Sequence, residues 1–280
     1  MIEELAIRQL ADYAAFFPGP HLAMVTASIL TGNTLGQLWA VRQDTDEPGL
    51  LLWDQGNKVF YLAGALASEA APAALRTLIT GTIRPAAVAA GVAYFKVHPL
   101  SATVAAVLPT LFPWCALREV ENLFYGFTQP LPNAIAPPPV ADLQFWPIDQ
   151  SLLLTETLEN VPLMRDEVRW MWPSLAHFYA HGFGVAAVVP GRVIGWCTAE
   201  YVSPTRCGIG ITTDDAYQGR GIASAMTAHF VQLCQQRGIT PYWECGRWNG
   251  PSMRVAEKVG FTLLTTEQFW VGAMGETAAG

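Results

Sequence analysis

The sequence predicts a mixed α/β fold divided into two domains. Short apolar runs bounded by turn residues alternate with longer stretches of helical periodicity, and a proline-rich segment interrupts the chain near its middle. Of the 280 residues, 51% are hydrophobic and only 14% are charged, which excludes a disordered chain. The order of the runs favours an α+β arrangement with a mixed sheet over a doubly wound parallel sheet.

The segment QPLPNAIAPPP at residues 129–139 is predicted to join the two domains. Its three consecutive prolines favour an extended conformation that continues neither a helix nor a central strand. We therefore predict an N-terminal α/β domain over residues 1–128, a linker over 129–140, and a second domain over 141–280.

The N-terminal half contains a predicted helix, a meander of three strands, and then alternating helices and strands. The segments DTDEPG and DQGN supply the Asp, Gly and Asn residues that tight turns need. This half has no nucleotide-binding loop, metal cluster or nucleophile motif. Its predicted elements are a helix over 3–16, strands over 35–41, 50–53 and 59–62, a helix over 68–83, a strand over 93–97, a helix over 103–111 and a strand over 117–127.

The C-terminal half is predicted to begin with a short strand and a long helical stretch, followed by antiparallel strands. A helix, a strand, a second short helix and a last strand pair complete the order. The predicted elements are a strand over 143–146, a helix over 152–179, strands over 184–190, 193–201 and 205–213, a helix over 222–236, a strand over 239–245, a helix over 252–258 and a strand pair over 260–272.

Composition restricts the partners. The formal net charge of −7 argues against nucleic acid, which requires a basic face. Five cysteines without a C-x-x-C pair indicate reduced thiols in a cytoplasmic protein. Prolines and polar residues interrupt the two uncharged stretches, 13–41 and 97–117, so neither is expected to span a membrane. We expect a monomer or homodimer.

Residues 218–224 read QGRGIAS, a glycine-rich turn that leads into a helix. The first backbone amides of a helix have no internal acceptor, and the helix dipole places partial positive charge there. Gly219 and Gly221 allow a phosphate to approach the backbone closely. A P-loop is excluded because its lysine is absent, and a dinucleotide fingerprint fits poorly because Ser224 replaces its third glycine. A purely structural strand-to-helix turn remains an alternative.

The segment resembles the GNAT superfamily of acyl-CoA-dependent N-acetyltransferases. The family signature [QR]-x-x-G-x-[GA] is met by Gln218, Gly221 and Ala223. A second family pattern follows at the family's spacing, with Asn249, Ser252 and then AEKVGF. The resemblance covers about residues 141–273 and implies a GNAT fold for the C-terminal half. The N-terminal half has a similar order of elements without the signature, so it is either a degenerate GNAT-like repeat or an unrelated α/β cap.

The resemblance implies acetyl-CoA as cosubstrate and no metal. In this family the strand before the signature separates from its neighbour and pairs with the pantetheine arm, here through Ile211 and Thr213. Asn249 and Ser252 match family positions near the cofactor, although both residue types are also good helix N-caps. The remaining cofactor-binding residues that the resemblance implies are Gln218, Gly219, Arg220, Gly221, Ile222, Ala223 and Ser224.

The frequent catalytic residues of the family are missing. Gly208 stands where many members carry a glutamate, and Ala256 stands where many carry a tyrosine. Glu244, on the strand expected to flank the cofactor, is the first candidate for the general base, and Glu200 is the second. The aromatic segment RWMWPSLAHFY either lines an apolar acceptor site or belongs to the core.

The implied function is an acyltransferase. It would transfer an acetyl group from acetyl-CoA to a primary amine of a small-molecule acceptor by direct attack. The alternative, suggested by Gly208 and Ala256, is a non-catalytic acyl-CoA-binding sensor or regulatory module. Release of free thiol in the presence of an amine distinguishes the two.

Overall fold

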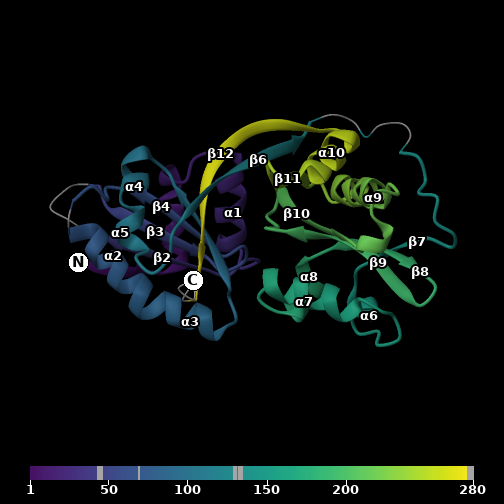
Figure 1. The fold of residues 1–280 in the computed structure, drawn as a ribbon, viewed down its shortest axis with the longest axis horizontal. Coiled ribbons are helices and arrows are strands. Elements are labelled where there is room, and N and C mark those ends of the chain that lie inside the picture. Colours follow the sequence, from purple (N-terminus) through teal and green to yellow (C-terminus); the bar gives the residue numbers. More distant parts are fainter. Residues whose placement is uncertain (43–46, 69, 129–130, 132–134, 276–280) are drawn as a thin grey trace. The chain divides into compact units, whose positions relative to one another are not determined.

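The computed structural model describes residues 1–42, 47–68, 70–128, 131 and 135–275, which form two compact units (Figure 1). Unit 1 contains Met1–Leu30, Leu35–Glu121 and the described part of Gln268–Gly280, and unit 2 contains Thr31–Thr34 and Asn122–Glu267. The linker predicted at 129–140 falls partly on residues 129–130 and 132–134, which lie outside the described residues.

Unit 1 is built on a mixed sheet with the strand order β1-β2-β3-β4-β5-β12. In the described residues its neighbouring strands are antiparallel except β4 and β5, which are parallel. The strands are β1 (Ile2–Leu5), β2 (Gly36–Val41), β3 (Gly49–Asp54), β4 (Val59–Gly64), β5 (Tyr94–Pro99) and the last residues of β12 (Phe261–Ala273).

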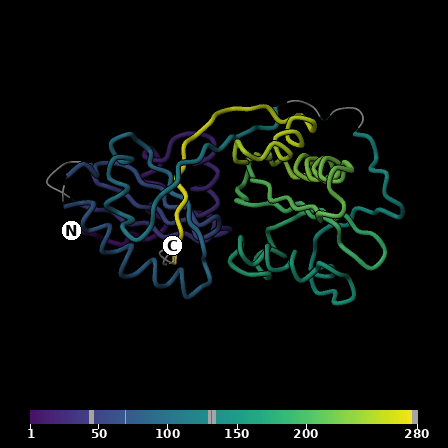
Figure 2. The backbone as a smooth tube through the Cα atoms, viewed as in Figure 1, coloured from purple at the N-terminus to yellow at the C-terminus, as the bar shows by residue number. Residues whose placement is uncertain are grey.

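The helices of unit 1 include one continuous stretch that connects β4 to β5. It consists of α2 (Ala70–Leu78), the π-helical turn η3 (Ile79–Ile83) and α3 (Arg84–Ala89), and Figure 2 shows the three as one uninterrupted coil. Leu75, Ile79 and Ile83 are buried against Phe60 and Phe95 of the sheet, so this stretch covers the core of unit 1. The other helical elements are η1 (Ile7–Ala11), η2 (Ala14–Phe16), α1 (Pro20–Leu30), α4 (Ala102–Ala106) and α5 (Leu108–Leu111).

The helix predicted over residues 3–16 is wrong. Residues 2–5 form β1, which pairs with β2 from Ile2↔Val41 to Leu5↔Leu38, and two 3-10 turns follow. Pairing with a strand more than thirty residues away outweighs the local helical pattern, which sequence periodicity alone cannot anticipate. The first α-helix begins instead at Pro20, and proline is favourable at a first helical position.

Unit 2 is built on a second part of the strand order, β12-β6-β11-β10-β9-β8-β7. Helices α9 and α10 cover one face of this part, and α6, α7 and α8 cover the other (Figure 1). The strands are β6 (Arg118–Phe127), β7 (Gln144–Pro147), β8 (Gly184–Val189), β9 (Arg192–Glu200), β10 (Arg206–Thr213) and β11 (Thr240–Gly246). The helices are α6 (Gln150–Leu153), α7 (Val161–Met171), α8 (Leu175–His181), η4 (Asp215–Tyr217), α9 (Ile222–Gln236) and α10 (Gly250–Val259).

The two units repeat one order of elements. In each, antiparallel strands lead to a strand that is joined through a helical stretch to a parallel neighbour: β4 to β5 in unit 1, and β10 through α9 to β11 in unit 2. The predicted mixed α/β fold is therefore confirmed, and the topology agrees with a repeated unit.

Two predicted elements in the C-terminal half differ from the structure. The helix over 152–179 is broken into α6, α7 and α8, because Asn160 adopts a left-handed φ of 69° and Trp172, which precedes a proline, is extended. The strand pair predicted over 260–272 is one strand, β12 (Phe261–Ala273), in which no turn interrupts the thirteen residues. Among the described helices, none has the length and apolar character to cross a membrane.

Candidate active site

The strand β10 has two different faces. Ile209 and Ile211 pack against the cluster that contains Trp243 and Val259, on the side of α9 and α10. Side chains alternate along a strand, so Gly208, Gly210 and Thr212 face the opposite side. There the hydroxyl of Thr212 donates a hydrogen bond to Glu167 Oε2 of α7 at 3.1 Å. We call this side, marked by residues 208, 210 and 212, the α7 face.

The pairing of β10 with its two neighbours is unequal. With β9 it is antiparallel over six residues, from Gly208↔Glu200 to Thr213↔Gly195. With β11 it is parallel and covers only Arg206↔Thr240 and Cys207↔Pro241. In the part of the chain that the structure describes, the β10–β11 ladder therefore ends at Cys207, and β10 continues for six more residues beside β9.

The equivalent strands of unit 1 do not separate in this way. There β4 and β5 pair over four residues, from Val59↔Lys96 to Leu62↔Pro99, and the amide of Leu100 donates to Leu62 O at 2.9 Å. A strand edge that continues past its partner presents backbone N–H and C=O groups to another extended chain. Of the two parallel strand pairs in the described residues, only β10 and β11 of unit 2 have such a free edge.

The loop after β10 leads directly into the N-terminus of α9. Gly219 and Gly221 have φ values of 72° and 81°, a region that residues with a Cβ avoid, and a Cβ at either position would meet nothing within 4 Å. The glycines are thus required by the backbone conformation, and the space around them is open. Because α9 begins at Ile222, the amides of its first three residues, Ile222, Ala223 and Ser224, have no acceptor within the helix. These amides and the helix dipole suit an anion such as a diphosphate.

The polar side chains of the loop brace the loop itself. Gln218 Nε2 donates to Asp215 Oδ1 at 2.7 Å and to Thr213 O at 3.3 Å. Arg220 Nη2 donates to Ala216 O at 3.1 Å, and its guanidinium lies over the ring of Tyr217. The first signature residue, Gln218, therefore stabilises the conformation in which the amides are presented.

Asn249 and Ser252 both have structural contacts. The side chain of Asn249 accepts a hydrogen bond from the Ser252 amide at 3.1 Å and caps the N-terminus of α10. Ser252 Oγ accepts from Trp243 Nε1 at 3.0 Å. The helix-capping alternative is confirmed for Asn249, whereas Ser252 holds a buried indole in place.

Glu244 lies on β11 and faces the same side as Gly208 and Gly210, because its neighbour Trp243 packs in the opposite core. Its Oε1 accepts a hydrogen bond from Asn122 Nδ2 of β6 at 2.6 Å. Burial, together with the negative charge of Glu244, raises the pKa of Glu267 on β12 to about 7. The α7 face of the sheet thus carries two carboxyl groups beside one amide.

Glu200 ends β9 directly opposite Gly208. Its carboxylate extends along the sheet and occupies the space that a Cβ at Gly210 would take, and Thr198 Oγ1 lies 3.0 Å from the same point. The carboxylate therefore lies over β10 itself, and the missing side chain at position 210 makes room for it. Glu200 and Glu244 come from the two strands that flank β10, and both lie on its α7 face.

Gly208 and Ala256, which stand where many family members carry a catalytic glutamate and tyrosine, differ in their surroundings. A Cβ at Gly208 would make only ordinary contacts, the nearest at 3.5 Å. Ala256 is fully buried in α10 among Trp243 and Phe261, so this position faces the core and has no opening toward the α7 face.

The aromatic segment after α7 belongs largely to the core. Trp172 and Phe178 are buried, and Trp172 Nε1 donates to Ala199 O at 3.1 Å, as the core alternative predicts. Trp170 is 45% exposed. The segment therefore fixes α7 and α8 against β9.

One carboxyl group on the α7 face was missed from the sequence. Glu167 lies three residues after Met164 and four before Met171 on α7, so it borders the buried apolar stripe of that helix. Burial raises the pKa of Glu167, and the Thr212 hydroxyl that donates to it opposes this shift in part. A charged residue at the edge of an apolar stripe was the signal available in the sequence.

The described residues contain no group of three or more His, Cys, Asp or Glu side chains placed to hold a metal ion. All five cysteines are unpaired thiols, and the two nearest, Cys207 and Cys234, have their sulfur atoms 3.8 Å apart in the core. Burial raises the pKa of Cys207 well above its usual value, so this thiol remains protonated.

Comparison with known proteins identifies the family. The model of the GNAT acetyltransferase family matches residues 14–268. The chain belongs to the GNAT acetyltransferase family. The match confirms the resemblance seen at residues 141–273, and it extends further, to most of the N-terminal half. An uncharacterized N-acetyltransferase of Bacillus subtilis (strain 168), YdfB, is 33% identical over 118 residues; this segment is 42% of the chain and only 44% of that relative.

Solved GNAT structures share the fold over nearly the whole chain. A GCN5-related N-acetyltransferase-like protein from Streptococcus suis 89/1591 has a TM-score of 0.66 at 17% identity and covers 95% of this chain and 98% of its own. A tandem GNAT protein from the clavulanic acid biosynthesis pathway has a TM-score of 0.56 at 13% identity, with coverages of 99% and 100%. At these identities the likeness concerns the fold alone, and it fits a two-domain GNAT-like arrangement.

Proposed function

We propose that this GNAT protein transfers an acetyl group from acetyl-CoA to a primary amine of a small molecule, at a single site in unit 2. The observation that carries the proposal is the early end of the β10–β11 ladder at Cys207, next to a loop with two left-handed glycines at the start of α9. Unit 1 has the same order of strands, but β4 and β5 stay paired, which supports one site per chain.

The residues beyond Cys207 fit an elongated cofactor with an anionic end. Ile211 and Thr213 lie in the part of β10 beyond Cys207, where β10 is no longer paired with β11. Their backbone groups there suit hydrogen bonds to the amides of a pantetheine arm. The diphosphate would bind the loop and first-turn amides from Gly219 to Ser224. Bound there, acetyl-CoA supplies an acyl group activated as a thioester.

We assign the general base to Glu200 in preference to Glu244. The Glu200 carboxylate lies over Gly210, within the part of β10 that the cofactor would follow, whereas the Glu244 carboxylate is held by Asn122 on the far side of β11. Glu200 takes a proton from the acceptor ammonium. The neutral nitrogen then forms a bond to the thioester carbon, a backbone N–H of β10 stabilises the oxyanion, and the C–S bond breaks. The thiolate takes the second proton of the attacking nitrogen, so that charges and protons balance.

The carboxylates of the α7 face also bear on the acceptor. Glu200 and Glu244 flank β10 on this face, and Glu167 is held close to Thr212. Negative charge here attracts a protonated amine and raises its local concentration. A small amine fits this face, and the chain has a net negative charge rather than a basic surface for nucleic acid.

Calorimetry and a thiol-release assay test the proposal together. We expect acetyl-CoA to bind with one site per chain, and free thiol to appear when a panel of primary amines is added. Replacement of Glu200 by Gln should lower kcat by about 10²- to 10⁴-fold, the usual contribution of a general base, while Glu244→Gln should have a smaller effect. Failure of acetyl-CoA to bind would refute the cofactor site. Binding without turnover on any amine would refute the transferase and support the acyl-CoA sensor.

A further inference from the structure

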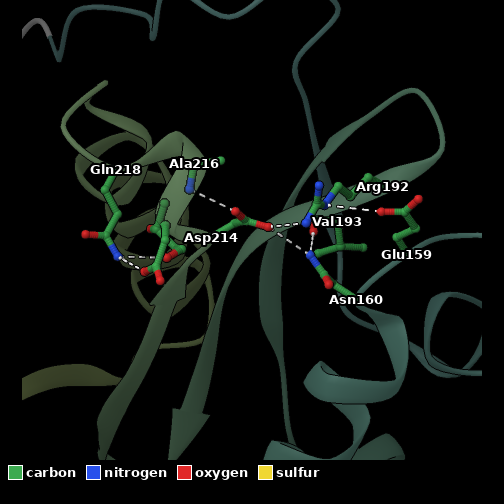
Figure 3. A network of polar contacts seen from close by, with 9 residues as sticks. Glu159, Asn160, Arg192, Val193, Asp214, Ala216 and Gln218 are labelled. Carbon is green, nitrogen blue, oxygen red and sulfur yellow. Dashed lines mark hydrogen bonds and ion pairs between the residues drawn. The ribbon is translucent and has the colours of Figure 1, made fainter.

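Asp214, the residue between β10 and the glycine-rich loop, accepts hydrogen bonds from three separate segments (Figure 3). Its Oδ1 accepts from the Ala216 amide at 3.0 Å. Its Oδ2 accepts from Asn160 Nδ2 at 3.1 Å and lies 2.7 Å from Arg192 Nη2. The Asp214 side chain is only 14% exposed, so these partners replace most of its water contacts.

The partners of Asp214 are themselves fixed. Asn160 precedes α7 with a left-handed φ of 69°, and its Nδ2 also donates to Val193 O at 2.9 Å. Arg192 begins β9 and also pairs with the more exposed Glu159, Nε to Oε2 at 3.5 Å. The backbone of Glu159 bonds to Gly191 and Val193 on both sides of Arg192. The start of α7 and the β8–β9 hairpin therefore form one support beneath Asp214.

A continuous series of bonds connects this support to the loop amides. The Asp214–Ala216 bond begins the short helix η4, and the side-chain Nε2 of Gln218 donates to Asp215 Oδ1 and to Thr213 O. Arg220 then bonds to Ala216 O. The side chains of Asp214, Gln218 and Arg220 are thus each hydrogen-bonded to another residue of the loop, and the series starts at Asp214.

A negative charge beside a diphosphate site is unfavourable unless a cation compensates it. Arg192 lies 2.7 Å from Asp214 and supplies that compensation. We propose that Asp214 is a positioning residue, which fixes residues 215–221 so that their amides face the diphosphate, and that Arg192 cancels its charge toward the cofactor. The inference rests on the proposed function, because it assigns the support of the same cofactor loop.

The test uses the full chain with Asp214→Asn, Arg192→Gln and the double variant, and two ligands. Coenzyme A carries the diphosphate, whereas S-acetyl-pantetheine lacks it. Asp214→Asn should weaken coenzyme A binding about tenfold, as expected when one charged hydrogen-bond partner is lost, and should leave kcat/KM for S-acetyl-pantetheine unchanged. Arg192→Gln leaves Asp214 charged and should weaken coenzyme A binding at least as much, and the double variant should recover part of this loss.

Hydrogen exchange provides a readout that needs no ligand. Amides 215–221 should exchange faster in Asp214→Asn than in the wild type, while amides of β9 should not change. Asp166→Asn, in the exposed Asp166–Arg169 pair of α7, is the matched control and should change neither binding nor exchange. If Asp214→Asn does not fold, Asp214→Ser keeps an acceptor for the Ala216 amide and removes only the contacts to Arg192 and Asn160.

The outcomes separate the two proposals. If the wild-type protein does not bind coenzyme A, the cofactor site is refuted. If amides 215–221 nevertheless exchange faster in Asp214→Asn, the support of the loop by Asp214 still holds. Unchanged coenzyme A affinity and unchanged exchange in Asp214→Asn would overturn the positioning role. An equal loss with coenzyme A and S-acetyl-pantetheine would also overturn it, because the defect would then be general.

Discussion

Replacement of Gly210 by Ala tests the position of the Glu200 carboxylate without changing any charged residue. The new Cβ would coincide with the space that Glu200 Oε1 occupies, and it would lie 3.0 Å from both Glu200 Cδ and Thr198 Oγ1. The carboxylate must therefore rotate away from β10. The backbone tolerates the change, since the φ of Gly210 lies outside the left-handed region.

The effect on stability should be small and the effect on activity large. Displacing the Glu200 side chain from its rotamer costs about 0.5–1.5 kcal/mol. The lower entropy of the unfolded chain with Ala offsets about 0.4–1 kcal/mol of that cost. Loss of a positioned general base lowers kcat by about 10²- to 10⁴-fold. The affinity for acetyl-CoA should stay near its wild-type value, because the amides of Gly219–Ser224 are unaffected.

Gly208→Ala is the matched control on the same strand and the same face. Its Cβ would make only ordinary contacts, at 3.5 Å or more, and Glu200 keeps its place. The thiol-release assay should therefore show near-normal kcat for Gly208→Ala and a strong loss for Gly210→Ala. The double variant of Gly210→Ala with Glu200→Gln should be no slower than either single variant. Normal turnover in Gly210→Ala, with Tm and acetyl-CoA affinity unchanged, would refute Glu200 as the base.

Three further predictions concern the loop, a helix cap and a raised pKa. Gly221→Ala should lower the free energy of unfolding by about 1–2 kcal/mol, because Gly221 has a φ of 81°, and should weaken acetyl-CoA binding. The control Gly238→Ala, at a φ of 68° just after the C-terminal end of α9, should lower stability as much but leave binding intact. Thermal unfolding measures the first effect and calorimetry the second. Asn249→Ala removes the cap of α10 and should destabilise the protein by about 1 kcal/mol in urea unfolding, whereas Asn249→Asp should not. The pKa of Glu267 is raised from 4.5 to about 7, so the folded state holds this proton more tightly than the unfolded state and loses stability as pH rises from 4.5 through 7. Glu267→Gln should therefore raise Tm at pH 8 and have little effect at pH 4. Equal shifts of Tm at both pH values would contradict this.

Local sequence patterns predicted most elements of both halves. Turn residues separated the runs that form β2, β3 and β4, whose predicted bounds lie within two residues of the observed ones, and the helix from 222 to 236 was predicted with the bounds that α9 has. The prediction was wrong where a distant partner decides the conformation, as at residues 3–16, where pairing with β2 produces a strand. It was also wrong at 152–179, where the left-handed Asn160 breaks a stretch with helical periodicity.

The candidate site was predicted in part for a similar reason. The glycine-rich loop could be found from the sequence because the backbone conformation there requires glycine at positions 219 and 221. The support by Asn160 and Arg192 could not be found, since these residues lie 54 and 22 positions before Asp214 and carry no local pattern. Glu167 was missed although it borders an apolar stripe.

The amino-acid sequence alone determined the family and the loop that would receive an anion, because a chain that must turn with positive φ and then begin a helix leaves a local signature. Only the tertiary structure decided which carboxylates stand beside β10. Glu200 reaches Gly210 across two paired strands, and Glu244 and Asn122 meet from β11 and β6. Such contacts between strands depend on strand register, and register is set by the folding of the whole sheet rather than by any one segment.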